Sequence, residues 1–296
     1  MRRQEGEAGL ILVNVLMFVA IASGLVLLMI SREEVALDRG LRMREASRAL
    51  AIVRGGELSA LVALRRDAQL SPEVDHIGEP WARLSEAGAP IEGGTFDLAI
   101  ADAEGRYNIN AVRRGDAASL ILFQTIAREV GLTEEQMVAA IAFVRLRGPV
   151  TDLRPLRMAG IDPKIAARME RLVTALPGET SLNLNAADEE MLRILFRDPV
   201  VAARLVAVRQ RQGFLTLKDL TDQNVTMPWG ASFRSNTFWV RTRATIGGTS
   251  QQGATLVQRR RTVEGVVEAV AVERWRNSAV PPEAPPLPSV GANASQ

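Results

Sequence analysis

The chain has 296 residues, of which 47% are hydrophobic and 24% charged, and its net charge is only +2. This is the composition of a globular protein with one membrane segment, and the near balance of charge argues against nucleic acid as a partner. There is no cysteine and a single histidine, His76, which excludes disulfides, thiolate zinc sites and most histidine-based metal or acid–base sites. His76 lies in a polar stretch and is expected to be a solvated loop residue.

Residues 10–30 form an apolar run without a charge, in which Asn14 is one of three interruptions. About 20 apolar residues at about 1.5 Å each span a hydrocarbon layer of about 30 Å, so a transmembrane helix is predicted. The run is longer than the apolar core of a cleaved secretory signal, which indicates an anchor that stays attached. Two arginines precede it, so the positive-inside rule predicts a cytoplasmic N-terminus and places the chain after Ile30 on the far side.

The helical pattern continues over residues 31–70, where apolar residues recur at helical spacing and charges fill the other faces. Gly40 and the pair Gly55-Gly56 are points at which this helix could bend. Half of the predicted rod therefore lies in lipid, and the other half carries an apolar stripe that needs a cover.

The rest of the chain alternates between strand and helix patterns. Residues 71–110 begin as a loop-rich connector and then alternate apolar with polar residues, residues 111–222 are helical throughout, and residues 223–276 are strand-like again. Strands on both sides of a helical block predict an α+β domain with an inserted helical subdomain, and the sheet is the natural cover for residues 31–70. The proline-rich residues 277–296 are expected to be a disordered tail.

The helical block repeats itself. Asn108–Ala111 is echoed by Asn183–Ala186, and in both an apolar residue between two asparagines precedes a helix, so the second asparagine is predicted as an N-cap. Asp162-Pro163 is likewise echoed by Asp198-Pro199, each an N-cap followed by proline at the first helical position. Small helical pairs built on one template are the plain interpretation. The predicted helix-cap motifs comprise Asn108, Asn110, Asn183 and Asn185.

Motifs for catalysis are absent from the sequence: there is no Gly-x-Ser-x-Gly, no phosphate-binding loop and no paired-histidine metal motif, which argues against an enzyme. Acidic clusters occur, but they lack the spacing of a calcium-binding loop, and acids in a first helical turn stabilise the helix dipole. We therefore expect no cofactor and no metal, with calcium at one of these clusters as the weaker alternative. The clusters are Asp97 with Asp102 and Glu104, residues 188–190, and Asp219 with Asp222.

The second repeat, which ends in Gly-Phe-x-Thr-Leu-x-Asp-Leu at residues 213–220, resembles helix-hairpin-helix modules. Such modules bind DNA phosphates through backbone N–H groups of a Gly-rich hairpin. Here Asp162 and Asp198 stand where a phosphate would approach, and the following proline removes a donor. A membrane-anchored DNA-binding protein of the competence type is the alternative function, and no nucleic-acid partner is expected.

The short basic leader of residues 1–9, followed directly by the apolar helix, resembles the prepilin leader of type IV pilins and type II secretion pseudopilins. The resemblance implies that a membrane-embedded prepilin peptidase cuts between Gly9 and Leu10. Two residues depart from the usual pattern of the class. Its mature chains usually begin with Phe or Met, where this chain has Leu10, and usually carry glutamate at the fifth position, where this chain has Asn14.

The missing glutamate, the large helical insertion and the Asn-x-Asn elements together resemble the K-type minor pseudopilins of type II secretion, over about residues 1–276. The resemblance implies a pilin-like α+β fold, in which the long N-terminal helix packs on an antiparallel sheet that carries an inserted all-α subdomain. It also implies a non-enzymatic structural subunit at the tip of the pseudopilus, which supports export of folded proteins across the outer membrane, with Asn14 determining its place in the filament.

The same resemblance implies the partners and the location. The partners would be the I-type and J-type minor pseudopilins, the major pseudopilin, the prepilin peptidase and the inner membrane. The chain would cross the bacterial inner membrane once, with its bulk in the periplasm.

Overall fold

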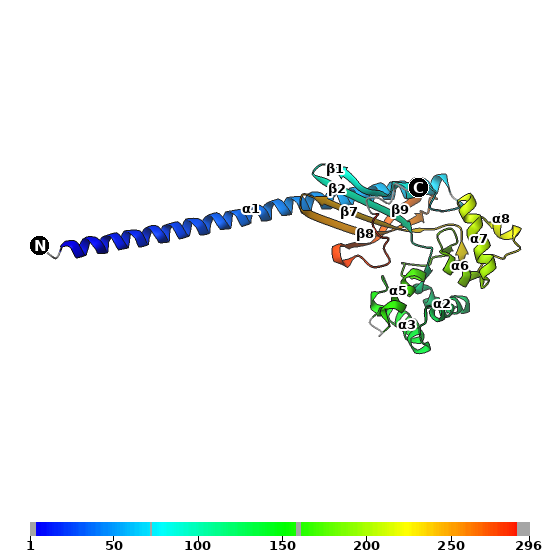
Figure 1. The fold of residues 1–296 in the computed structure, drawn as a ribbon. Helices are drawn as coiled ribbons and strands as arrows, with labels where there is room; N and C mark the ends of the chain where they lie inside the picture. Colours follow the sequence, from blue (N-terminus) through cyan, green and yellow to red (C-terminus); the bar gives the residue numbers. More distant parts are fainter. Residues whose placement is uncertain (1–3, 72, 158–160, 289–296) are drawn as a thin grey trace.

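The computed structural model describes residues 4–71, 73–157 and 161–288, without the side chains of residues 4–12 and 156–157. Its first element, α1 (Gln4–Leu70), is one continuous helix, and neither Gly40 nor the pair Gly55-Gly56 interrupts it. Figure 1 shows α1 as a rod whose N-terminal half stands clear of the rest of the chain.

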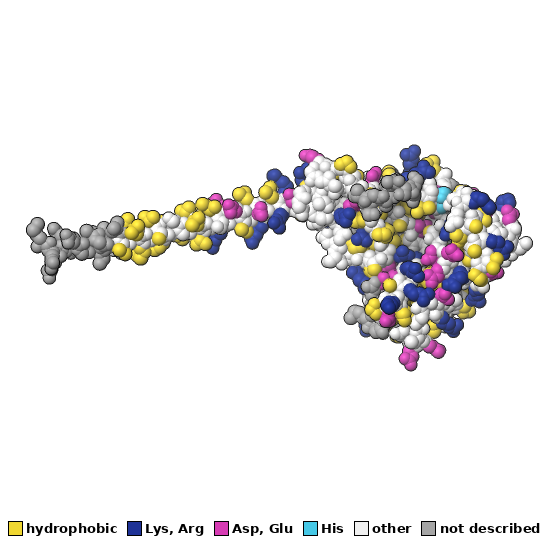
Figure 2. All heavy atoms as spheres, in the orientation of Figure 1, with side chains coloured by type: hydrophobic (Ala, Val, Ile, Leu, Met, Phe, Trp, Pro, Cys, Tyr) yellow, Lys and Arg dark blue, Asp and Glu magenta, His cyan; other side chains and the backbone are white. Residues whose placement is uncertain are grey.

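The free part of α1 carries the membrane-spanning signal. Every side chain of residues 13–44 is exposed. Its most apolar 18-residue window has a mean hydropathy of 2.6, and none of that window is buried. Figure 2 shows hydrophobic side chains along this part, with charged side chains gathering where α1 approaches the globular part of the chain, termed here the head. Within the described residues, α1 is the one helix long and apolar enough to cross a membrane.

The head is built on a five-stranded antiparallel sheet in the order β1-β2-β7-β8-β9. The chain leaves this sheet after β2 and returns at β7, so residues 103–236 form an insertion between two neighbouring strands. The predicted α+β class with an inserted helical subdomain is therefore confirmed. The strands are β1 (Glu86–Ile91), β2 (Gly94–Asp102), β7 (Thr237–Ile246), β8 (Thr249–Arg261) and β9 (Val267–Arg276).

The second half of α1 covers one face of the sheet, as the apolar stripe predicted. Small residues on α1 allow the close approach, since a Cβ added at Gly56 would lie 2.5 Å from the ring of Phe96. The buried contacts form two clusters, which together contain Ala49, Val53, Ala60 and Leu64 of α1, Trp81, Leu98 and Ile100 that precede the insertion, and Phe238, Val240, Ala244, Ile246 and Val257 of β7 and β8.

The opposite face of the sheet is covered by the segment after β9, and here the predicted disorder is wrong for residues 277–288. After η3 (Asn277–Ala279), Val280 and Ala284 pack against Trp239 and other apolar residues of this face. The Arg241 Nη1 donates to the Pro285 carbonyl at 3.1 Å. A turn in which the Ala284 N–H donates to the Pro281 carbonyl at 3.2 Å presents the small side chain of Ala284 to the sheet. Residues 289–296 lie outside the described residues.

The insertion folds as a helical subdomain with one core of its own. Figure 1 shows it beyond the end of the sheet remote from the N-terminus and to one side of α1. As predicted, Asp162 and Asp198 cap helices that begin with proline. The helices are η2 (Ile109–Arg114), α2 (Ala117–Val130), α3 (Glu134–Arg147), α4 (Arg154–Arg157), α5 (Pro163–Leu172), α6 (Glu189–Phe196), α7 (Pro199–Gln212) and α8 (Leu217–Asp222).

A short strand pair joins the start of each repeat of the subdomain to a later segment of the same repeat. One parallel pair joins β3 (Tyr107–Asn108) to β4 (Val173–Thr174), and a second joins β5 (Leu182–Asn183) to β6 (Ala231–Ser232). A short 3-10 helix, η1 (Ala82–Leu84), precedes β1 in the segment that follows α1.

Candidate functional site

The two Asn-x-Asn motifs adopt the same turn. The Asn108 Oδ1 accepts the N–H of Asn110 at 3.1 Å, and the Asn183 Oδ1 accepts the N–H of Asn185 at 2.9 Å. Asn108 is in this way the N-cap of η2. All four side chains are buried. The internal repeat seen in the sequence is therefore a repeat of side-chain geometry as well.

The second asparagine of each motif is not a helix cap. The side chain of Asn110 accepts the N–H and donates to the carbonyl of Val150, both at 2.9 Å. Asn185 does the same with Leu215, at 2.6 and 3.2 Å. A carboxamide has both a donor and an acceptor, so it pairs with a distant backbone as a neighbouring strand would. The N-caps of α2 and α6 are aspartates instead, which lie nearer to those helices.

The first asparagine of the second motif lies at a polar junction between the sheet and the helical subdomain. Asn183 is fully buried, and its Nδ2 lies 3.0 Å from the carbonyl of Asp75, 2.8 Å from the Asp102 Oδ2 and 3.0 Å from the Ser235 Oγ. These three residues belong to the segment after α1, to the end of β2 and to the return before β7. One side chain thus connects three stretches that are far apart in the sequence.

Asp75 is the centre of this junction, because each of its polar groups has a partner. Its N–H donates to the carbonyl of Phe233 at 2.9 Å, and its carbonyl accepts from Asn183. Its Oδ2 accepts the N–H of Ser235 at 2.9 Å, and its Oδ1 accepts from the guanidinium of Arg259. The segment after α1 is therefore tied both to the insertion and to the sheet.

Arg259 on β8 is a buried cation that bridges two carboxylates. Its Nη2 donates to the Asp67 Oδ2 at 2.6 Å, its Nη1 pairs with Asp75, and its guanidinium lies 4.3 Å from the ring centre of Phe238. The side chains of all three charged residues are at most 3% exposed. This pairing fixes the end of α1 to the sheet and to the segment that follows it.

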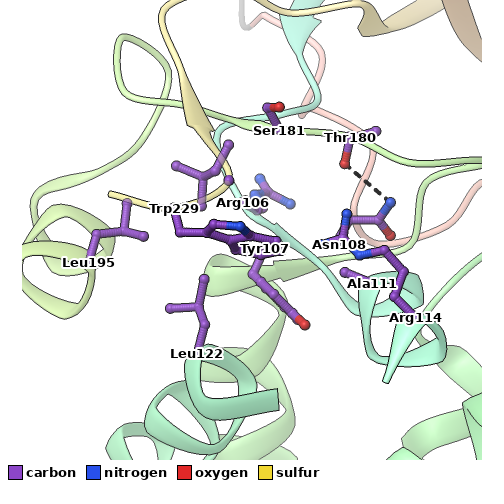
Figure 3. Close-up of a pocket in the computed structure, with 12 residues that line it drawn as sticks. Arg106, Tyr107, Asn108, Ala111, Arg114, Leu122, Thr180, Ser181, Leu195 and Trp229 are labelled. Atoms are coloured by element: carbon purple, nitrogen blue, oxygen red, sulfur yellow. Dashed lines mark hydrogen bonds between the residues drawn. The ribbon is translucent and has the colours of Figure 1, made fainter. Parts of the chain in front are cut away.

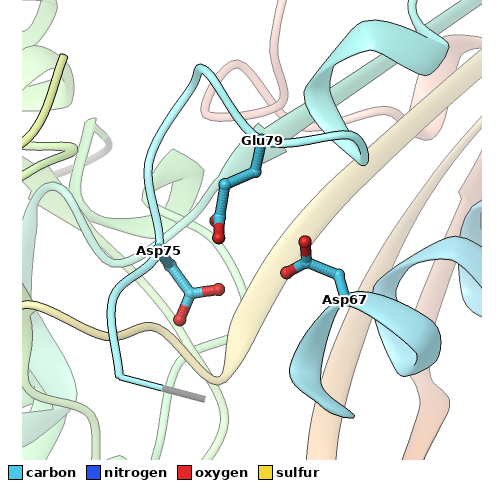
Figure 4. A group of neighbouring side chains, drawn as sticks. All are labelled: Asp67, Asp75 and Glu79. Carbon is cyan, nitrogen blue, oxygen red and sulfur yellow. The ribbon is translucent and has the colours of Figure 1, made fainter. Parts of the chain in front are cut away.

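Asp67, Asp75 and Glu79 converge on one point, as Figure 4 shows, with one oxygen of each within 4.8 Å of the others. Glu79 accepts from the Trp81 Nε1 and from the backbone N–H of His76, both at 3.0 Å. Three carboxylates are a ligand set that a hard divalent cation prefers. Here, however, the Arg259 guanidinium already pairs with two of them, so the resident cation of this cluster is an arginine.

Burial sets the electrostatics of the junction. It raises the pKa of Asp67 to about 6, with the nearby charge of Glu79 adding to the effect and that of Arg259 opposing it. Burial also raises the pKa of Asp102 to about 6 and that of Glu104 to about 8. Near neutral pH, Glu104 is therefore mostly protonated, whereas Asp67 and Asp102 are mostly ionised but take up a proton at a higher pH than an exposed aspartate.

Acidic residues from each of the clusters noted in the sequence make contacts within the chain. The carboxylate of Asp97 accepts from the N–H of Gly88 and from Arg243, both at 2.8 Å. Asp219 forms a capping box with Thr216, and Asp222 pairs with Lys218 at 2.5 Å. In residues 188–190, Asp188 caps α6, and Glu190 pairs with Arg168 and Arg171 at 3.2 and 3.0 Å.

At both helix starts that would hold DNA phosphates, an aspartate side chain already accepts backbone N–H groups. The carboxylate of Asp162 accepts the N–H of Lys164 at 2.7 Å. The carboxylate of Asp198 accepts the N–H groups of Val200 and Val201 at 2.8 and 3.2 Å. Because these are the N–H groups that a phosphate would need, the DNA-binding alternative is not favoured.

Sequence reasoning missed the junction of Asp67, Asp75, Glu79 and Arg259. Asp75 and Arg259 are 184 residues apart, so no local motif links them. The one usable signal is Arg259 itself, which follows Thr255 and Val257 on alternate positions of the strand face that meets α1. His76 is also less solvated than expected: it is half-buried and stacks on Phe214, with 4.7 Å between ring centres.

At the membrane end, Asn14 is exposed on the free part of α1, among apolar side chains. Gly9 and Leu10 belong to the same helix, but their side chains lie outside the described residues. The structure thus brings the four asparagines of the repeats into the head and leaves Asn14 alone on the rod.

Comparison with known proteins agrees with this architecture. No model of a protein family matches the chain. The chain is 27% identical over 256 residues to the Type II secretion system protein K of Pseudomonas aeruginosa, which covers 74% of this chain and 77% of that protein. It is 26% identical over 265 residues to the protein of the same name from Klebsiella pneumoniae, which covers 72% of this chain and 81% of that one.

The fold has also been seen in a solved structure. A chain in the crystal structure described as the GspK-GspI-GspJ complex from the enterotoxigenic Escherichia coli Type 2 Secretion System matches with a TM-score of 0.63. The two are 17% identical, and the match covers 81% of this chain and 99% of that chain. At this identity, the match shows that the two chains share a fold.

Proposed function

We propose that this chain, which is a minor pseudopilin of the K type in type II secretion, is a non-enzymatic structural subunit at the tip of the pseudopilus. The observation that carries the placement is Asn14, an uncharged residue exposed on the free part of α1. The bulk of the helical subdomain supports the same placement.

The argument from Asn14 concerns charge in the membrane. In pilin-type filaments a glutamate at this position pairs with the N-terminal amine of the preceding subunit, because a charge in lipid is costly unless it is paired. An amide has no charge with which to neutralise that amine. A subunit with Asn14 therefore forms no charge pair with a preceding subunit, so it is suited to the tip of the filament, where no subunit precedes it.

The argument from shape concerns stacking. Filament subunits of this class stack with their rods side by side, so each head must leave room for the next. The helical subdomain, inserted at residues 103–236, lies beyond the end of the sheet and to one side of α1 (Figure 1). A head enlarged in this way fits at the end of a stack and would obstruct a subunit placed above it.

Processing and location follow from α1. We propose that the prepilin peptidase cuts between Gly9 and Leu10, and that residues 10–30 hold the chain in the bacterial inner membrane with the head in the periplasm. The I-type and J-type minor pseudopilins are the proposed tip partners, with the major pseudopilin below them. The assembled filament would support export of folded proteins across the outer membrane.

The test is the substitution Asn14→Glu in a cell that makes pseudopili, with Asn14→Gln as the matched control. Glutamate would let the chain follow another subunit, so the number or the length of the pseudopili should change. Glutamine keeps an uncharged amide and should leave both unchanged. If Asn14→Glu alters neither number nor length, Asn14 does not determine the position of the subunit.

A further inference from the structure

The helical subdomain has an apolar hollow on its surface that the internal repeats do not explain. It has a volume of about 220 Å³ and lies between α2, the end of α6 and the loop that precedes β6. A smaller hollow of about 30 Å³ adjoins it and shares Leu122, Leu195 and Trp229 with it. Figure 3 shows Trp229 between Leu195 and Arg114, with Leu122 beside it.

Two large apolar side chains of this hollow remain open to solvent. Trp229 is 54% exposed and Ile121 is 46% exposed, although the same subdomain buries a continuous core. Single exposed apolar residues are common on any protein. Here two of them line one hollow, which gives a ligand an apolar wall to pack against. Tryptophan is also among the residues that contribute most to protein–protein binding.

A contact within the chain orders the exposed indole of Trp229 before any other protein binds. The Arg114 guanidinium lies 4.9 Å from the ring centre of Trp229. Arg114 is itself fixed, since it pairs with Asp116 at 3.2 Å and donates to the Ser119 Oγ at 2.8 Å. A side chain ordered in advance loses little freedom on binding, so more of the contact energy is available for affinity.

Three arginines line the two hollows, and Arg197 is the one whose charge is open to a partner. Arg114 already pairs with Asp116 at 3.2 Å and with Glu179 at 3.8 Å, and the half-buried Arg106 donates to the Glu283 carbonyl at 3.4 Å. The described lining residues of the two hollows include Arg106, Arg114 and Arg197 and no acidic residue. Arg197 is exposed, and within the described part of the chain its guanidinium has no ion pair. It follows α6 in the left-handed conformation, with φ 53°.

We propose that this hollow, termed here the Trp229 groove, binds a protein segment that presents an apolar side chain next to carboxylates. The apolar side chain would pack between Trp229, Ile121 and Leu195, and the carboxylates would meet Arg197 at the rim. The small volume suits a short segment rather than a folded surface. This inference goes beyond the proposed function and does not depend on the position of the subunit in the filament.

The experiment uses the full chain in lipid nanodiscs and two fluorescein-labelled peptides, Ser-Asp-Leu-Phe-Glu-Asp and its basic counterpart Ser-Lys-Leu-Phe-Lys-Lys, measured by fluorescence polarisation. Empty nanodiscs correct for binding to lipid. The acidic peptide should bind saturably and at least tenfold more tightly than the basic one. Absence of saturable binding, or equal affinity for the two peptides, would overturn the proposal.

Variants locate the binding. Trp229→Ala should weaken binding of the acidic peptide at least tenfold, and Arg197→Glu should weaken it while strengthening binding of the basic peptide. Leu217→Ala and Arg211→Glu are matched controls, because both residues are exposed outside the groove, and they should change neither affinity by more than twofold.

Folding of each variant is checked by its melting temperature, and Ile121→Glu replaces Trp229→Ala if the latter is less stable. Ile121 lines the same groove and is about half exposed, so the substitution Ile121→Glu should weaken binding of the acidic peptide in the same way. Equal effects of the groove variants and the matched controls would refute the site.

Discussion

Replacing Arg259 by methionine should be among the most damaging single changes in the head. Methionine keeps much of the length and the packing against Phe238, but it removes the cation between Asp67 and Asp75. Breaking a buried ion pair from one side typically costs about 3–5 kcal/mol, because a buried charge is left without a partner. For a domain of this size that corresponds to a fall in melting temperature of about 6–20 °C.

The effect should depend on pH in a defined direction. Burial raises the pKa of Asp67 to about 6 while Arg259 opposes the rise, so without Arg259 the pKa would be higher still. A carboxyl group whose pKa is raised by folding does not affect the free energy of unfolding at a pH where it is protonated in both the folded and the unfolded state. As the pH rises from the unfolded pKa towards the folded pKa, the unfolded state ionises first and the folded state loses stability. The gap in melting temperature between wild type and Arg259→Met should therefore be smaller at pH 5 than at pH 8.

The assay is thermal unfolding of the full chain, followed by circular dichroism at pH 5, 6, 7 and 8. Arg274→Met is the matched control, since Arg274 also joins the sheet to α1, through Glu57 at 2.7 Å, but its side chain is 52% exposed. Such a pair is worth about 0–1 kcal/mol. The reasoning fails if Arg259→Met costs no more than Arg274→Met, or if its gap stays constant or shrinks from pH 5 to pH 8.

Three further predictions concern α1 and the repeats. Gly56→Ala should lower the melting temperature because the added Cβ would overlap the ring of Phe96 on the sheet. Gly55 has open space at its Cβ, so Gly55→Ala should stabilise the fold by about 0.5–1 kcal/mol through helix propensity and raise the melting temperature. Equal shifts of the two variants would contradict the packing. Asn185→Leu leaves the buried N–H and carbonyl of Leu215 without partners. The free energy of unfolding in urea should fall by about 1–3 kcal/mol for each of these two groups. No loss of stability would show that the pairing of Asn185 with Leu215 is dispensable. In cells with a prepilin peptidase, mass spectrometry should find Leu10 as the N-terminus, and an intact leader would refute processing.

The sequence was most informative where the pattern is local. α1 was predicted as one amphipathic rod because its apolar residues recur at helical spacing over dozens of positions, and the sheet covers it as the stripe requires. The insertion was predicted because strand and helix patterns alternate in blocks. The repeated Asn-x-Asn turns were visible because each depends on residues two apart.

The parts that sequence reasoning missed depend on contacts between distant residues. Nothing local tells that Asn110 pairs with Val150, so it was assigned the commoner role of a cap. The segment of residues 277–288 looks disordered by composition, and only the apolar face around Trp239 and Ala254 makes it fold. The junction at Asp75 required knowledge of β8 and of the end of α1 together.

The most direct test of the central claim is the position of this subunit in an isolated pseudopilus. Pseudopili can be overproduced together with the full chain and labelled for electron microscopy with gold-bound antibody against the helical subdomain. A tip subunit predicts gold at one end of each filament and none along its length. Gold spaced regularly along the filament would contradict the account, because the chain would then follow other subunits despite Asn14.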